Sequence, residues 1–320
     1  MVIFALVSLM ACLAMAYLPA LTFVLAIAWG ISLIIGSLYL TKNQIAVIWG
    51  LNILLLYGLT GNNSMFFYFS FFGLPFMVMS FLAAEEDKGY YYILKRGIMA
   101  SLIGVSLFMG FIYLTTGGVG IGQLEKQLDN YFEESWQQYE KSGAVEFYEQ
   151  KGITNEEIKT QVKDFAHSIA RHLPAFFYLE SISVVFLVLY LSSYLSRKRQ
   201  IMRLMKKPFT REIMPWQGAW VVIAGLVLWL WGRDNNSVLY LTGSNILLLC
   251  TAITIYFGLS ALTYKIKQLK PSTRKVTILI LIVLSVMFTI SAIIFLALLG
   301  LFDSLIDYRK LRSQKEEEQE

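Results

Sequence analysis

The stretch Arg197-Lys-Arg-Gln-Ile-Met-Arg-Leu-Met-Lys-Lys-Pro-Phe-Thr-Arg-Glu-Ile-Met-Pro-Trp216 orients the whole chain. It holds seven basic residues and one acidic residue between two long apolar runs. Dense positive charge beside membrane-length apolar segments indicates a cytoplasmic loop, because basic residues are retained on that side of a bilayer. The segments before and after this loop can therefore be assigned to one side of a membrane by counting crossings.

The composition of the 320 residues predicts an all-α polytopic transmembrane helical bundle. Hydrophobic residues make up 57% of the chain and charged residues only 15%, and the apolar residues lie in runs longer than a soluble core helix needs. The net charge of +5 comes from the loops, so it indicates contact with anionic lipid headgroups rather than with nucleic acid. The two cysteines lie inside apolar stretches, which argues against a disulfide framework.

Apolar runs and charged loops divide the chain into six parts. The last apolar run is expected to break near Phe288 to Ser291 into a hairpin, since a single crossing would leave the basic tail outside. Each arm is then shorter than the roughly 20 residues of a full span. The parts are helices 1 to 5 (1–116), an extracytoplasmic amphipathic helical segment (117–173), helix 6 (174–196), the basic cytoplasmic loop (197–216), the C-terminal helices with the hairpin (217–306) and a charged cytoplasmic tail (307–320).

Polar side chains inside the apolar runs are the candidate ligand-binding residues. Asn52 lies mid-membrane and Glu180 lies inside the sixth crossing, where burying a polar group without a partner is costly. Each also has a structural interpretation, in which Asn52 bonds to a neighbouring helix and Glu180 reaches interfacial water or the Tyr178 hydroxyl. The aromatic residues expected to line a pocket with them are Tyr57, Phe67, Tyr68 and Trp136.

Charged residues at the cytoplasmic ends of the helices are expected to contact lipid headgroups or partner proteins. Asp303 and Asp307 are one helical turn apart, so a helix would place both on one face, near Arg309 and Lys310. An ion-pair cluster that anchors the inner interface and a coupling or partner-binding site both fit this pattern. The full set is Arg197, Lys198, Arg199, Arg203, Lys206, Lys207, Asp303, Asp307 and Arg309.

Motifs of the common enzyme classes are absent from the sequence. It has no Walker motif, no nucleophile elbow and no metal-binding His/Asp cluster. His167 and His172 are five residues apart, a spacing that splays two side chains on a helix. We therefore expect no catalytic residues, no cofactor and no bound metal.

Two segments carry a resemblance to a known family. These are Lys207-Pro-Phe-Thr-Arg-Glu-Ile-Met-Pro-Trp216 and the terminal Gly300-Leu-Phe-Asp-Ser-Leu-Ile-Asp-Tyr-Arg309. In this order along the chain they resemble the YybS-type bacterial membrane proteins, a family similar to the substrate-binding S components of energy-coupling-factor vitamin transporters. The resemblance implies a bundle of about six N-terminal helices that holds a small ligand toward its outer side. It also implies a location in the bacterial cytoplasmic membrane.

Two classes of function remain open from the sequence. The first is an S-component-like subunit that binds or transports a small molecule among the N-terminal helices. The second is a non-enzymatic structural or assembly subunit of a membrane protein complex, whose outer helices and basic loops dock other proteins. A ligand site inside the bundle would favour the first class, and an uncovered apolar outer surface the second.

Overall fold

The computed structural model describes residues 1–115, 129, 132–133, 135–136, 154–197, 201 and 204–311. All regular elements in these residues are helices, and six of them are long and apolar enough to cross a membrane. The chain is therefore an all-α multipass membrane protein, which confirms the predicted fold class. It divides into two units, Met1–Lys206 and Lys207–Glu320.

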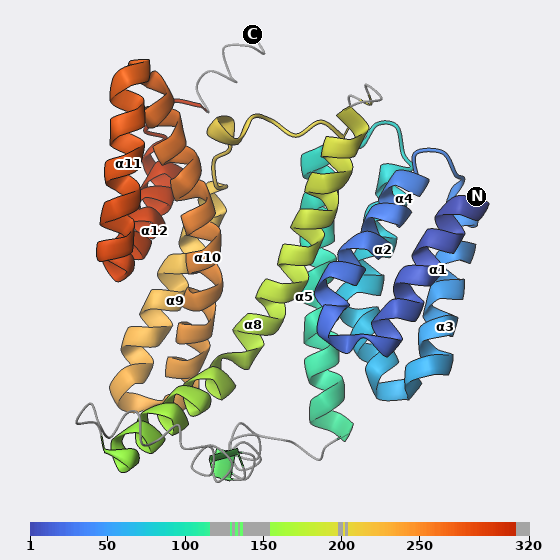
Figure 1. The fold of residues 1–320 in the computed structure, drawn as a ribbon, viewed down its shortest axis with the longest axis horizontal. Coiled ribbons are helices and arrows are strands. Elements are labelled where there is room, and N and C mark those ends of the chain that lie inside the picture. Colours follow the sequence, from blue (N-terminus) through green and yellow to red (C-terminus); the bar gives the residue numbers. More distant parts are fainter. Residues whose placement is uncertain are drawn as a thin grey trace. The chain divides into compact units, whose positions relative to one another are not determined.

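The first unit gathers the N-terminal helices around a core of large apolar side chains (Figure 1). Rings of Phe67, Phe71 and Phe108 lie 4.3 to 5.6 Å apart, and Trp29 meets Phe76 edge to face at 5.3 Å. Its elements are α1 (Val2–Tyr17), η1 (Pro19–Leu21), α2 (Thr22–Gly36), α3 (Lys42–Tyr68), η2 (Phe69–Gly73), α4 (Leu74–Ala83), α5 (Tyr90–Thr115) and α8 (Asn155–Arg197).

The long helical stretch from Lys42 to Ala83 is a hairpin rather than one crossing. Gly61 has φ 74°, a backbone conformation that interrupts the helix and that glycine adopts without steric cost. The indole nitrogen of Trp49 donates a hydrogen bond of 2.8 Å to the Gly73 carbonyl, and these two residues are equally far from Gly61 along the chain. The two arms therefore run antiparallel, and the first unit makes six helical passes in its described residues.

A proline explains the wide π-helical turn η2 at Phe69–Gly73. Pro75 has no backbone N–H, so the carbonyl of Phe71, four residues earlier, loses its helical donor. The Ser181 hydroxyl of α8 donates to that carbonyl at 2.7 Å, and Ser101 of α5 lies 2.6 Å from the same hydroxyl. The π-turn thus ties three helices together through one carbonyl group.

The helix α8 is continuous where the sequence placed a boundary between the outer segment and the sixth crossing. It runs for 43 residues with Pro174 inside it, and Figure 1 shows its first part leaning away from the direction of its second part. The helix begins with a capping box: the Glu157 N–H donates to the Thr154 hydroxyl at 3.3 Å, and the Thr154 N–H donates to the Glu157 carboxylate at 3.0 Å.

The second unit is a smaller helical bundle. Gly258 and Gly300 face each other, and a Cβ on either would lie about 2 Å from a backbone carbonyl oxygen of the opposite helix. The helix is interrupted at Phe288, between Met287 and Thr289. This position lies inside the range where the sequence predicts the turn of a hairpin. Its elements are η4 (Phe209–Arg211), α9 (Trp216–Asn235), α10 (Ser237–Gln268), α11 (Pro271–Met287) and α12 (Thr289–Ile306).

Candidate functional site

The buried amide of Asn52 is the first candidate. Ile45, Ile48, Asn52 and Leu56 form the buried stripe of the first arm of α3, so the amide points into the core and is 0% exposed. The hydroxyl of Ser8 lies 3.4 Å from the amide oxygen and 3.0 Å from the carbonyl of Ala5. The amide nitrogen has no hydrogen-bond partner in the described residues. Rotating the amide by 180° would only exchange which end lacks one.

A second unused donor lies in the same hydrophobic core. Trp29 is 0% exposed, and its indole N–H has no hydrogen-bond partner among the residues that the structure describes. Leaving a buried donor unpaired costs about 1 to 3 kcal/mol, so natural cores usually avoid it. The core of the first unit therefore keeps hydrogen-bonding capacity that its own described side chains do not use.

The remaining candidate ligand-binding residues do not converge on Asn52. Tyr57 is 49% exposed, because five residues along a helix turn a side chain to a different face. Tyr68 is buried and its hydroxyl donates to the carbonyl of Met15 at 3.3 Å. Phe67 packs in the aromatic core, and Trp136 stacks on Phe132 at 5.6 Å in the outer segment.

Glu180 lies in the membrane part of α8 and is half-buried. The Tyr178 hydroxyl, one of its possible partners from the sequence, pairs instead with Ser106 of α5 at 2.7 Å. Among the described residues, none forms a hydrogen bond or an ion pair with Glu180. The carboxyl group therefore stays a candidate for contact with a ligand or with interfacial water.

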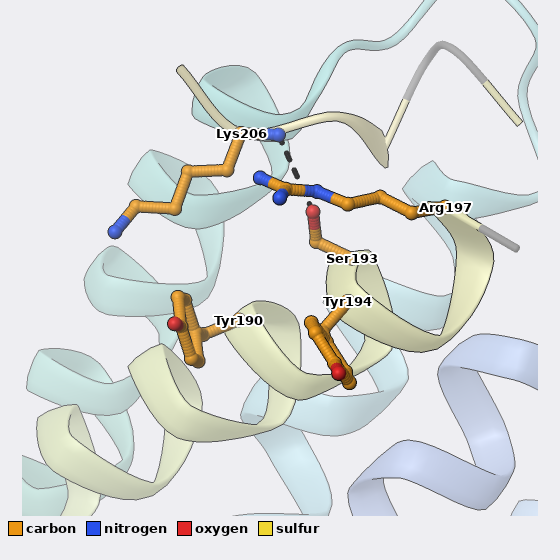
Figure 2. A pocket seen from close by; sticks show the side chains of 5 residues that line it. All are labelled: Tyr190, Ser193, Tyr194, Arg197 and Lys206. Atoms are coloured by element: carbon orange, nitrogen blue, oxygen red, sulfur yellow. Dashed lines mark hydrogen bonds between the residues drawn. The ribbon is translucent and has the colours of Figure 1, made fainter. Parts of the chain in front are cut away.

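Two of the basic residues line a shallow hollow at the end of α8, which is shown in Figure 2. Tyr190, Ser193, Tyr194 and Arg197 come from the last two turns of the helix, and Lys206 comes from the chain that follows it. The backbone N–H of Lys206 donates to the Ser193 hydroxyl at 3.3 Å and holds this chain against the helix. Lys207 is exposed and opens the second unit, whereas Lys198, Arg199 and Arg203 lie outside the described residues.

The second unit holds a buried ion pair between Arg309 and Asp303. The side chains are 0% and 1% exposed, and the closest N to O distance is 2.6 Å. The guanidinium also donates to the carbonyls of Thr210 and Glu212, at 2.8 and 2.6 Å, and to the Ser260 hydroxyl at 3.0 Å. All five N–H groups of the arginine are thereby used.

This arrangement joins the two segments that carry the family resemblance. Arg309 belongs to the terminal segment, and Thr210 and Glu212 belong to the loop before α9. Ser260 adds to the joint, since its hydroxyl lies 2.6 Å from the Phe209 carbonyl and 2.8 Å from the Glu212 carbonyl. The Glu212 carboxylate accepts a hydrogen bond from Tyr256 of α10. The ion pair therefore fixes the loop to α10 and α12.

Asp307 does not share the face of Asp303. The helix α12 ends at Ile306, and Asp307 takes the left-handed conformation with φ 48°. Its carboxylate accepts a hydrogen bond of 3.0 Å from the N–H of Leu311. Asp307 is thus the C-cap residue of α12, and among the described residues Asp303 is the carboxylate that pairs with Arg309.

Several contributing residues escaped the sequence reasoning. Ser181, Ser260 and Glu212 are ordinary polar residues in the sequence, and their partners lie 44 to 110 positions away. One local signal was available, because Pro75 implies an unpaired carbonyl at Phe71. The pairing of Trp49 with Gly73 follows equally from a turn at Gly61.

The chain belongs to the family described as predicted membrane protein (DUF2232), whose model matches residues 4–304. No curated protein and no solved structure matches the chain.

Proposed function

We propose that the protein is a small-molecule binding subunit of a membrane transport system, with the ligand held among the six passes of its first unit. The observation that carries this proposal is the Asn52 amide, which is completely buried and has one end without a partner in the described residues. The resemblance to YybS-type proteins and S components supports it, since both imply a six-helix N-terminal binding unit. On this proposal the subunit is not itself an enzyme.

The surroundings of Asn52 restrict the chemistry of the ligand. The core cluster of the first unit consists of hydrophobic side chains, and the unpartnered polar atoms of Asn52 and Trp29 are neutral. A charged ligand would pay a large desolvation penalty in such a site, whereas an apolar body with a carbonyl or ether oxygen could accept from the Trp29 indole N–H. We therefore propose an uncharged, largely apolar ligand with at least one hydrogen-bond acceptor.

The test is native mass spectrometry of the protein purified in mild detergent, followed by identification of any bound small molecule. We expect a retained ligand in the parent protein and its loss in Asn52→Leu. The control is Asn245→Leu in α10, since the Asn245 amide already donates to the Leu241 carbonyl at 2.8 Å. Equal retention in both variants, or no small molecule in any preparation, would contradict binding at Asn52.

A second candidate function rests on α11. None of its 17 residues is buried, so this helix contributes little to the packing of its own unit. Such a helix is available to a neighbouring membrane protein, which fits a structural or assembly subunit. Photo-crosslinking from Leu279, which is exposed, would test this function: crosslinks to one defined protein support it, and crosslinks to lipid alone oppose it.

We further propose that the protein lies in the bacterial cytoplasmic membrane, with the basic loop 197–216 and the charged tail 307–320 on the cytoplasmic side. Both native cysteines, Cys12 and Cys250, are buried, so a single added cysteine gives a clean labelling signal. Lys88 lies between α4 and α5, two passes before the basic loop 197–216 and therefore on the same proposed side as that loop. Lys88→Cys should resist a membrane-impermeant maleimide in intact cells and react after lysis. Labelling of intact cells would reverse this orientation.

A further inference from the structure

We propose that the outer arm of α8, residues 155–173, lies on the surface of the lipid bilayer and places its apolar side among the acyl chains. The outer arm carries six acidic or basic side chains, too many for a membrane-spanning segment, so the crossing begins at about Pro174. This contact is separate from the interior of the bundle around Asn52 and does not rest on the proposed transport function.

One side of the outer arm is an apolar stripe made of Val162, Phe165 and Ile169. These residues are three and four positions apart, which is the spacing that aligns side chains on one face of a helix. They are 43%, 66% and 38% exposed, although all three are large and hydrophobic. An exposed apolar stripe beside a membrane-spanning helix indicates contact with another apolar surface.

The opposite side of the outer arm is polar. It carries, at the same helical spacing, Thr160, Asp164, His167 and Arg171. The His167 ring lies 2.8 Å from the Asp129 carboxylate, and Lys163 forms an ion pair with the same carboxylate at 3.1 Å. This contact with the outer segment is on the polar side, so it does not cover the apolar stripe.

The path of α8 favours the bilayer as the surface that the apolar stripe contacts. Among residues 155–173, all of which the structure describes, only Ala170 is buried, so the outer arm is hardly packed against its own unit. Figure 1 shows the outer arm, in green, leaning away from the other helices of that unit. Phe176, two turns after Ile169, is 42% exposed and continues the apolar stripe into the membrane part. A helix that leans outward at the membrane boundary turns this side toward the lipid, and an apolar face opposite a charged one is the pattern that binds a bilayer surface.

The experiment attaches an environment-sensitive fluorophore to single added cysteines of the full-length protein in phosphatidylcholine vesicles that contain brominated lipid. Both native cysteines are buried, so the added cysteine is labelled selectively. We expect the probe at Phe165→Cys to emit at a shorter wavelength than in water and to be quenched by bromine. Bromine near the headgroup end of the acyl chain should quench more than bromine near its methyl end, because a surface helix sinks only about 5 to 10 Å into the bilayer. The probe at Thr160→Cys, on the polar side of the outer arm, is the matched control and should show neither effect.

A second pair of variants tests the apolar stripe itself. In the Phe165→Cys protein, Ile169→Glu puts a charge on the stripe one turn away and should reduce the quenching. Thr160→Glu adds the same charge on the polar side and should leave the quenching unchanged. Emission at short wavelength without quenching would mean that protein rather than lipid covers the stripe, and would overturn the proposal. Equal quenching at both labelled positions, or emission as in water from Phe165→Cys, would overturn it as well.

Discussion

Arg309 in the second unit and Asn52 in the first unit are both buried, but they differ in how fully their donors are paired. In the second unit the guanidinium of Arg309 uses all its N–H donors on Asp303, Ser260 and two loop carbonyls. In the first unit the Asn52 amide and the Trp29 indole each leave a donor unused in the described core. A saturated network specifies one arrangement of its segments, whereas an unsaturated one keeps an interaction in reserve for another molecule. The comparison supports a structural role for Arg309 and is the basis of the binding role that we propose for Asn52.

The largest expected effect is the loss of Arg309. Arg309→Met leaves the Asp303 carboxylate buried without its cation and frees the loop carbonyls, so we expect a loss of about 3 to 5 kcal/mol of stability. Unfolding of the purified protein in denaturant measures it. Asp303→Leu together with Arg309→Met should recover part of the loss, because no buried charge remains. Unchanged stability of the Arg309→Met variant would contradict the structural role of Arg309.

Close backbone packing in the first unit should give the next largest effect. A Cβ at Gly104 of α5 would lie 2.0 Å from the carbonyl oxygen of Ser70, so Gly104→Ala forces the helices apart and should cost about 2 to 3 kcal/mol. Gly110 of the same helix has nothing within 4 Å of such a Cβ, and Gly110→Ala should stabilise slightly through helix propensity. Opposite signs in the same unfolding assay confirm that packing holds this unit; equal effects argue against it.

The Asn52 substitution should change the ligand-free protein in the opposite direction. Asn52→Leu removes an incompletely paired buried amide and fills its place with an apolar group, so we expect a gain of about 1 kcal/mol. Ligand-free protein is required, because a bound molecule would stabilise only the parent. A clear loss of stability would show that the Asn52 amide already has its hydrogen-bond partners in the fold. Asn52 would then not differ from Arg309 in this respect.

The smallest effect concerns the outer segment. His167 and Lys163 lie 2.8 and 3.1 Å from the Asp129 carboxylate and lower its pKa below the ordinary value. A lowered pKa means that the stabilising contribution of the Asp129 carboxylate is fully present above about pH 4, the usual pKa of an unfolded aspartate, and is lost as the pH falls through the lower folded-state value. Hydrogen exchange of residues 155–170 should therefore rise only in strong acid. Asp129→Asn should show the faster exchange already at neutral pH, and identical exchange would contradict the contact.

Local patterns in the sequence were enough for the fold, and less so for the candidate sites. The membrane-length apolar runs predicted the helices that are long and apolar enough to cross a membrane. A helical projection would already have separated Tyr57 from Asn52. The hydrogen bonds from Arg309 to the carbonyls of Thr210 and Glu212 could not be predicted from the sequence. These residues lie almost 100 positions earlier, and contacts over such a separation leave no periodic signal. Pro174 marks the predicted start of the sixth crossing, and the helix continues through it.

The helix α8 is long enough for a small bend in its middle to move its first turn by several ångströms. Forty-three helical residues extend about 65 Å, roughly twice the hydrocarbon thickness of a bilayer. Pro174 interrupts the hydrogen-bond ladder between the two arms, so bending is easiest there. A rotation of about 10° at this fulcrum would move the far end of the outer arm by about 5 Å, close to one helical turn. The same rotation would move Glu180, which lies six residues beyond Pro174, much less than the first turn of the helix at Asn155.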